Sequence, residues 1–249
     1  MKKTDKASTL RTLWILVMSL LYTANTCVGS IMRGFFGISS RKWVDDALQL
    51  WLKRVLKLAR IKVHVFNPYK IKTQTGQPTI IMCNHSSLYD IPFSLAAFPS
   101  NSLRMLAKKE MSRIPLMGRA MVAAEFPFID RKNRHQAIKD LAFVRKLLEG
   151  GIVMWIAPEG TRSEDGHLAP FKKGAFITAI QAKATIIPIG IRGANAILPA
   201  RTHQLNLNQT AEVHIGKPID ASPFTLDNKE ELIEQVFQSI KQLVEGGAP

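Results

Sequence analysis

Cysteine and tyrosine are scarce in this chain. Their scarcity argues against a protein held by disulfides or cysteine-bound metals, and against one that stacks nucleic-acid bases. The 249 residues contain only two cysteines, Cys27 and Cys83, which lie far apart in apolar surroundings. They form neither a disulfide framework nor the Cys-x-x-Cys spacing of many metal sites. With three tyrosines and no recognisable nucleic-acid motif, stacking platforms for bases are not expected either. We therefore expect the body of the protein in a reducing, cytosolic compartment, without nucleic acid as a partner.

Acidic residues are also few. Against 34 lysines and arginines stand 19 aspartates and glutamates, which gives a formal net charge of +15. This charge predicts attraction to nucleic acid, an acidic membrane surface or a phosphorylated substrate, although a merely basic soluble enzyme would show it too. Hydrophobic residues make up 46%, enough for the core of one large domain or two small ones.

An apolar stretch at residues 13–32 follows a basic amino terminus. Its length is about that of one bilayer crossing, and no clean small-x-small cleavage site of a signal peptide follows it. Several polar residues, from Ser19 to Ser30, weaken it as a spanning helix, and basic residues on both sides give no clear orientation. We expect a helix that dips into one leaflet, with a full crossing as the alternative.

Residues 41–60 show helical periodicity, with apolar residues at Val44, Leu48, Trp51, Val55 and Leu58. The other face carries lysines and arginines, as in helices that lie on an anionic membrane surface. An ordinary helix packed on a core is the alternative. We expect residues 1–60 to anchor the protein to a membrane and residues 61–249 to form the catalytic domain.

The body of the chain alternates between strand-like and helix-like segments. Strands are predicted at 62–66, 78–83, 103–107, 126–129, 152–157, 185–191 and 211–215. Helices are predicted at 87–97, 116–124, 134–148, 173–182 and 229–244. Helices between most of the strands indicate an α/β fold, with a mixed, largely parallel central sheet flanked by helices.

A polar turn with His85 follows the apolar run 79–83, at the strand end where open α/β sheets bind ligands. Asp90 can reach His85 only if the histidine lies in the turn before a helix and Asp90 in its first turn, because five positions along one helix do not share a face. Asp90 would then orient the imidazole, and the other ring nitrogen could take a proton from a hydroxyl. Alternatively, Ser87 and Asp90 form a capping box and His85 only bonds to backbone. The spacing is compatible with both.

A second polar cluster, residues 158–163, follows the apolar run 151–157. Gly160 allows a ligand to approach the backbone closely, and Arg162 offers a forked donor suited to phosphate. Glu159 and Thr161 can hold hydroxyl groups. The alternative is a tight turn with a surface salt bridge, but two such segments after two strands predict one shared cleft.

Further cations stand at predicted strand ends or just beyond them: Lys108, Lys109 and Arg131. Each taken singly is typical of a solvated surface charge. Several cations close to a candidate base predict a site for an anionic substrate.

Four segments in order resemble the motifs of the glycerolipid acyltransferases, and most closely those of the bacterial 1-acyl-sn-glycerol-3-phosphate acyltransferases. HSSLYD at 85–90 matches their His-x-x-x-x-Asp motif, and PEGTRS at 158–163 matches their third motif. FIDR at 128–131 and IPI at 187–189 are similar to the second and fourth, and the segments 107–110 and 171–175 also fit. The resemblance spans about residues 60 to 218. It departs near Glu125 and Phe126, where the family usually has glycine or another small residue.

The resemblance implies a mechanism. His85 is the general base on a free glycerol hydroxyl, Asp90 orients it, and the hydroxyl attacks the thioester of an acyl-CoA or acyl-carrier protein directly. The absence of a Gly-x-Ser-x-Gly elbow agrees with this. The implied substrate-binding residues are Lys108, Arg131 and Arg162 for the phosphate, with Glu159, Gly160 and Thr161 for the glycerol. No metal and no cofactor are implied, apart from the acyl donor as co-substrate.

The implied acceptor is lysophosphatidic acid, the product is phosphatidic acid for phospholipid synthesis, and membrane lipids are partners. The expected location is the bacterial inner membrane, with the active site at the cytoplasmic face. Two alternatives remain: an acyltransferase for another lysolipid, such as a lyso-ornithine lipid or another lysophospholipid, or a non-catalytic basic protein that binds membranes or nucleic acid. The last explains the charge but leaves the segments 85–90 and 159–162 without a role.

Overall fold

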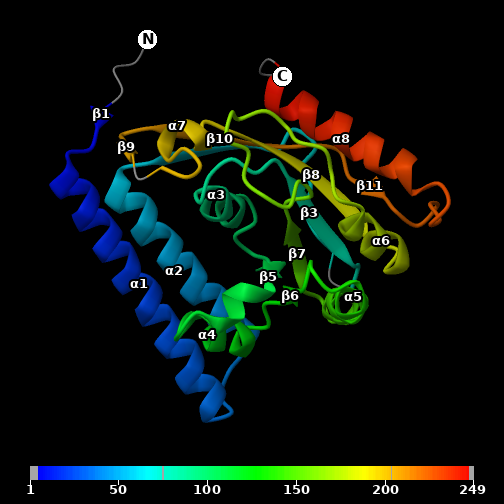
Figure 1. Cartoon of the computed structure of the whole chain (residues 1–249), viewed down its shortest axis with the longest axis horizontal. Helices are drawn as coiled ribbons and strands as arrows, with labels where there is room; N and C mark the ends of the chain where they lie inside the picture. Colours follow the sequence, from blue (N-terminus) through cyan, green and yellow to red (C-terminus); the bar gives the residue numbers. More distant parts are fainter. Residues whose placement is uncertain (1–4, 75, 203, 247–249) are drawn as a thin grey trace.

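The computed structural model describes residues 5–74, 76–202 and 204–246. Among these residues the main sheet has seven strands. Six of them lie side by side in the order β2, β10, β8, β3, β7, β4, and the seventh, β11, pairs with β8. The strands β10, β8, β3 and β7 are labelled in Figure 1. Their bounds are β2 Lys62–Phe66, β3 Thr79–Cys83, β4 Leu103–Met105, β7 Val153–Ile156, β8 Thr185–Arg192, β10 Thr210–Ile215 and β11 Ile219–Asp220. Strands β8, β3, β7 and β4 are parallel, whereas β10 and β11 run antiparallel to β8. The predicted mixed, largely parallel sheet is confirmed.

Helices cover both faces of this sheet. One face packs against α2 (Arg41–Ala59) and α3 (Asp90–Ala97), and the other against α5 (Arg134–Glu149), α6 (Lys173–Gln181) and α8 (Lys229–Glu245). Alternate side chains of a strand point to opposite faces. In β3, Ile81 therefore belongs to the same core as Leu52 of α2, while Ile80 and Met82 belong to the core under α5, α6 and α8. Because both faces are covered, β3 is buried along its whole length, which explains its continuous apolar run.

The predicted elements are present, with boundaries shifted by a few residues. The strand predicted at 103–107 is divided: β4 ends at Met105, and β5 (Ala107–Lys108) pairs with β6 (Phe128–Ile129) in a separate small sheet. The helix predicted at 87–97 begins only at Asp90, because residues 84–89 form a turn. Short elements were not predicted: β1 Asp5–Lys6, η1 Lys109–Arg113, α7 Ala194–Ile197, β9 Asn206–Leu207 and β11.

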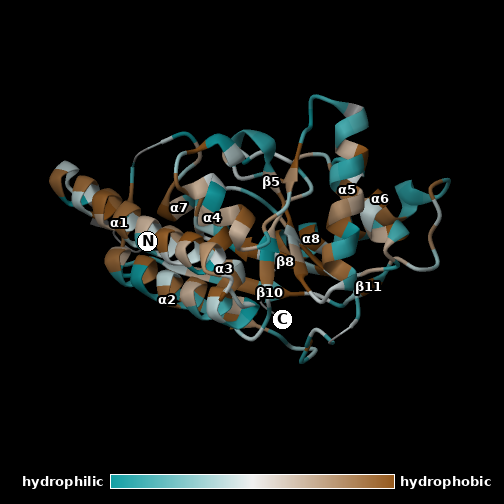
Figure 2. Ribbon diagram, turned by 90° about the horizontal axis from the view of Figure 1, so that it is seen from below, coloured by the Kyte–Doolittle hydropathy of each residue, from teal (hydrophilic) through white to brown (hydrophobic). Residues whose placement is uncertain are grey.

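Two helices from the amino terminus lie along one end of the molecule (Figures 1 and 2). α1 (Thr9–Phe35) contains the apolar stretch and is long and apolar enough to cross a membrane. Three of its hydroxyl groups are satisfied within the helix, since Thr23, Thr26 and Ser30 each donate to the carbonyl four residues earlier. α1 packs against α2 and α4 (Met117–Ala123). Large apolar side chains remain exposed on it, among them Leu10, Leu13, Leu16, Val17, Leu20 and Leu21.

Two ion pairs tie α2 to the part of the chain that follows it. Arg104 of β4 is only 1% exposed; its Nη1 lies 2.7 Å from Asp45 Oδ1, and its Nε donates to the carbonyl of Ala124 at 2.6 Å. Arg41 binds both carboxylate oxygens of Glu125, at 2.6 and 2.8 Å. Glu125 has a φ of +61°, a backbone conformation that glycine adopts most readily. Near this position the resembled family usually has a small residue, whereas here Glu125 forms an ion pair with Arg41.

Candidate active site

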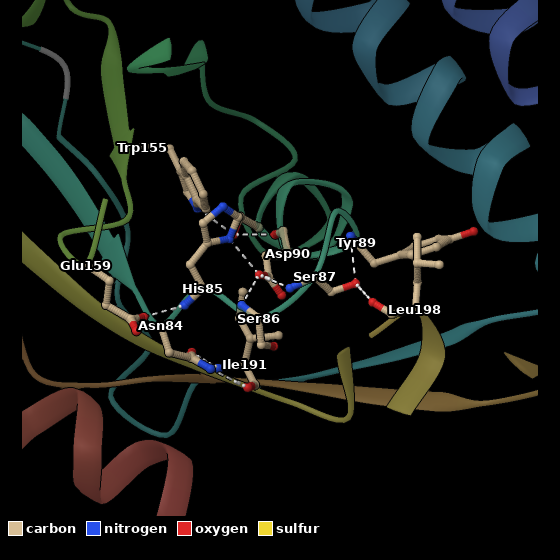
Figure 3. Close-up of polar contacts among 11 residues, drawn as sticks. Asn84, His85, Ser86, Ser87, Tyr89, Asp90, Trp155, Glu159, Ile191 and Leu198 are labelled. Carbon is tan, nitrogen blue, oxygen red and sulfur yellow. Dashed lines mark hydrogen bonds and ion pairs between the residues drawn. The ribbon is translucent and has the colours of Figure 1, made fainter. Parts of the chain in front are cut away.

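The turn at residues 84–89 is fixed to the carboxyl edge of the sheet (Figure 3). Asn84 pairs with the backbone of Ile191 in β8: its side chain donates to the carbonyl at 2.9 Å and accepts from the N–H at 2.8 Å. Ser87 donates its hydroxyl to the carbonyl of Leu198 at 2.8 Å. These bonds hold His85 at the edge where sheets of this kind bind ligands.

The imidazole of His85 and the carboxylate of Asp90 meet in this turn. His85 Nδ1 lies 2.8 Å from Asp90 Oδ2, and the same oxygen accepts the N–H groups of Ser86 at 2.7 Å and Ser87 at 2.8 Å. Asp90 is fully buried and is the first residue of α3. Asp90 therefore holds the ring and also accepts two N–H groups of the turn. The alternative, in which His85 bonds only to backbone, is wrong. Of the capping box only the bond from the N–H of Ser87 to Asp90 is present, because the hydroxyl of Ser87 donates to Leu198 instead. Because Asp90 occupies Nδ1, the other ring nitrogen, Nε2, can exchange a proton with a ligand.

Glu159 joins the two polar segments. One of its carboxylate oxygens accepts the N–H of His85 at 2.7 Å, and the other accepts the N–H of Ala169 at 2.9 Å. The carboxylate is buried, which raises the pKa of Glu159, while the two backbone donors oppose that rise. Ser163 also donates its N–H to the carbonyl of His85 at 2.7 Å. Residues 84–90 and 158–163 thus form one structural unit.

A cavity of about 370 Å³ is lined by His85, whose Nε2 makes no hydrogen bond within the described part of the chain. Five of the expected substrate-binding residues line it as well: Lys108, Arg131, Gly160, Thr161 and Arg162. The small β5–β6 sheet brings the first two together, and the loop after β7 supplies the other three. Glu159 is not part of the lining, because its carboxylate is turned to the backbone. Lys109, another of the predicted cations, does not line this cavity; its Nζ lies 2.9 Å from Oδ2 of Asp130.

Arg131 and Gly160 are in contact. Arg131 donates through Nη1 to the carbonyl of Gly160, which has a φ of +79°. A Cβ added at Gly160 would lie 3.1 Å from that Nη1. The surrounding loops desolvate the guanidinium and lower the pKa of Arg131, while the carboxylate of Glu110 opposes this. Arg131 is exposed as a whole residue and has no ion pair among the described residues, so its charge is available to an anionic ligand in the cavity.

Three residues of the site were missed by the sequence analysis. The ring of Trp155 meets the imidazole of His85 edge to face, with centroids 5.7 Å apart (Figure 3). Asn84 was given no role by the sequence analysis, and its position directly before His85 was the available signal. Arg201 lines the cavity from the loop after α7. It lies far from the polar motifs in sequence, so no local pattern points to it.

An imidazole backed by a buried carboxylate, opening on a cavity with several cations, defines a class of protein. Such a site can accept a proton from a hydroxyl group and hold an anionic substrate beside it, as enzymes that use general-base catalysis require. Comparison with known proteins gives this class a family.

The model of the Acyltransferase family matches residues 62–192, more than half of the chain. The chain belongs to this family. It is 29% identical over 194 residues to human 1-acyl-sn-glycerol-3-phosphate acyltransferase alpha, covering 78% of this chain and 67% of the relative. It is 38% identical over 132 residues to the 1-acyl-sn-glycerol-3-phosphate acyltransferase of Cocos nucifera, covering 52% of this chain and 42% of the relative.

A solved structure is similar over nearly the whole fold. The crystal structure of the 1-acyl-sn-glycerophosphate acyltransferase from Thermotoga maritima matches with a TM-score of 0.79 and 26% identity. The match covers 95% of this chain and 94% of that one. The architecture of that enzyme, including its amino-terminal part, is therefore shared.

Proposed function

We propose that the protein transfers a fatty acyl group from acyl-CoA or acyl-carrier protein to the sn-2 hydroxyl of 1-acyl-glycerol-3-phosphate, making phosphatidic acid for phospholipid synthesis. The observation that carries this proposal is the His85–Asp90 pair, which faces a cavity lined by cations. The general base accounts for the activated hydroxyl, and the cations account for the phosphate. The names of the similar enzymes support this choice of acceptor.

In the proposed reaction, Nε2 of His85 takes the proton of the sn-2 hydroxyl while that oxygen attacks the thioester carbonyl. Asp90 stabilises the imidazolium that forms. When the tetrahedral intermediate collapses, the carbon–sulfur bond breaks and the leaving thiolate takes the proton back from Nε2. Lys108, Arg131 and Arg162 hold the acceptor phosphate, and Gly160 and Thr161 shape the space for glycerol. Glu159 acts through the backbone of His85, as a positioning residue.

The proposal places the site at the cytoplasmic face of a bacterial inner membrane, anchored by α1 and α2. The exposed apolar side chains of α1 supply the surface for lipid. Arg11 lies over the ring of Trp14 at 4.4 Å, and Arg33 over that of Trp43 at 4.8 Å, pairings suited to the headgroup region. Because α1 also packs against α2 and α4, insertion into one leaflet is favoured over a crossing.

The test is incubation of the purified protein with lysophosphatidic acid and an acyl thioester, followed by lipid analysis. Phosphatidic acid is the expected product. The assay includes lyso-ornithine lipid and other lysophospholipids, and acylation of one of these alone would keep the reaction but contradict the proposed acceptor.

His85→Ala is the matching variant, and its rate should fall by about 10²–10⁴-fold, the usual contribution of a general base. His64→Ala is the control, because His64 is exposed on the edge strand β2, away from the site. Both variants should bind lipid vesicles like the wild type. Full activity in His85→Ala would remove this residue from the mechanism.

A further inference from the structure

A second cavity, of about 590 Å³, adjoins the catalytic one. The two share Lys108, Arg131 and Gly160 in their walls. The second cavity then extends toward α5 and α6, where its lining includes Lys132 and Lys172. It is therefore continuous with the catalytic cavity but has cations of its own.

The charges around this second cavity are unbalanced. Lys108, Arg131, Lys132 and Lys172 line it, against the single carboxylate of Glu110. Lys132 approaches Glu110 only to 3.9 Å. Within the described part of the chain, neither Lys108 nor Lys172 forms an ion pair. Cations that gather around a hollow without carboxylate partners favour a bound anion.

The amino end of α6 adds to this preference. Gly174 and Ala175, in the first turn of α6, line the cavity. No side chain in the described structure caps this helix end, and its first turn carries no acidic residue. The free N–H groups and the positive end of the helix dipole therefore favour an anion at the same place as the lysines.

A third cavity reaches the catalytic one from the membrane side. It has a volume of about 480 Å³, is lined by Ile15 and Leu16 of α1, and shares Arg162 and Arg201 with the catalytic cavity. In both views of the molecule, α1 lies at one end and α5 and α6 at the other (Figures 1 and 2). Arg162 and Arg201 thus lie toward α1, whereas Lys132 and Lys172 lie toward α5 and α6. Lys108 and Arg131 are common to the catalytic and the second cavity.

We infer that the second cavity binds the phosphate of the phosphopantetheine arm of the acyl donor, the group that acyl-CoA and acyl-carrier protein share. Lys132, Lys172 and the amino end of α6 form this donor-phosphate site. The inference rests on the proposed function, in which two phosphate-bearing substrates must meet at His85. A lipid that arrives past α1 leaves the cations on the far side for the phosphate of the soluble donor.

The test uses two ligands that differ only in this group, 4′-phosphopantetheine and pantetheine, with binding measured by calorimetry on the whole protein. Wild type should bind the phosphorylated ligand about three- to tenfold more tightly, between the values expected for an exposed and a buried charge contact. Lys172→Gln and Lys132→Gln should each reduce this difference, and the double variant should reduce it further, to what the amino end of α6 contributes. In kinetic assays the double variant should raise the KM for either acyl donor by a similar factor and leave the KM for lysophosphatidic acid unchanged.

Lys173→Gln is the matched control. Lys173 is the next residue in the chain, but its Nζ is paired with Glu230 at 2.6 Å and it does not line the cavity. This variant should keep the full preference for phosphopantetheine.

Several outcomes would overturn the donor-phosphate site: equal binding of the two ligands by wild type, an undiminished preference in the double variant, or a KM increase for lysophosphatidic acid instead of the donor. An effect on acyl-CoA but not on acyl-carrier protein would assign the cavity to the nucleotide phosphates and contradict the phosphopantetheine assignment. Because calorimetry needs no turnover, a lack of acyl transfer would contradict the proposed function separately.

Discussion

Two side chains at the sheet are each paired with an aspartate, the imidazole of His85 and the guanidinium of Arg104, and they differ in what the pair leaves free. Asp90 binds Nδ1 of His85, while the other side of the ring faces the catalytic cavity. Asp45 binds Arg104, whose other donors are directed to the carbonyls of Ala124 and Leu103. The first pair is open to a ligand, and the second is closed by the protein.

This difference separates a chemical role from a structural one. The buried guanidinium of Arg104 donates to Asp45 and to two backbone carbonyls, so it holds elements together. An imidazole with one free nitrogen can instead exchange a proton. Neighbouring lysines show the same contrast. Lys109 and Lys173 are paired with Asp130 and Glu230, while Lys108 and Lys172 face cavities.

The largest expected effect breaks the open pair by Asp90→Asn. Oδ2 of Asp90 accepts every hydrogen bond of this carboxylate, and Oδ1 has no partner among the described residues, so the amide NH₂ of asparagine can take the place of Oδ1. The turn should stay folded, while loss of the charge lowers the proposed transfer rate by roughly 10²–10⁴-fold. Rate measurements together with a melting curve check this, and an active Asp90→Asn would contradict the role of the charge.

Breaking the closed pair should cost stability instead. Arg104→Met leaves Asp45 without its cation and the carbonyl of Ala124 without its donor. We expect a loss of about 3–5 kcal/mol in the free energy of unfolding, measured by denaturant titration. Arg145→Met, at an exposed pair with Glu149 at 3.6 Å, should lose at most about 0.5 kcal/mol. Similar losses in the two variants would show that Arg104 is not a clamp.

Gly160→Ala should produce a smaller, mixed effect. The alanine Cβ meets a positive φ and crowds Arg131 at 3.1 Å, so we expect a loss of about 1 kcal/mol in stability and weaker binding of the acceptor. Gly151→Ala is the control, because Gly151 also has a positive φ, of +88°, but nothing within 4 Å of the added Cβ. Both variants should lose stability, and only Gly160→Ala should raise the KM for the acceptor; equal KM values would place Arg131 outside the acceptor site.

The smallest effect concerns the half-exposed Arg41–Glu125 pair. Arg41 lowers the pKa of Glu125 in the folded state, so its contribution to stability is present above the ordinary glutamate pKa and is lost as the pH falls through the lowered folded value. Glu125→Gln should therefore reduce the free energy of unfolding by at most about 1 kcal/mol at pH 7. Unfolding curves at several pH values should show this difference disappear in acid. A difference that stays constant with pH would mean that the ion pair is not its source.

Much of the site could be predicted from short segments. The turn at residues 84–90 was predicted as the site, but the spacing of His85 and Asp90 left their pairing open. It is formed because α3 begins only at Asp90, which folds the carboxylate back over the turn. The strand β3 was evident because both of its faces are buried. The division of the segment 103–108 into β4 and β5 was not evident, because it depends on pairing with residues 128–129.

The sequence by itself determined most strands, the main helices and the two polar segments with their cations, since these follow from periodicity and from residues a few positions apart. The structure then decided between the two interpretations of His85 and Asp90. Only the tertiary structure decided which cations face a cavity and which are neutralised, and that Glu159 holds the backbone of His85. The physical reason is that the partner of a charge is chosen by distance in space. Lys173 finds Glu230 across the packed helices α6 and α8, and no local pattern contains that contact.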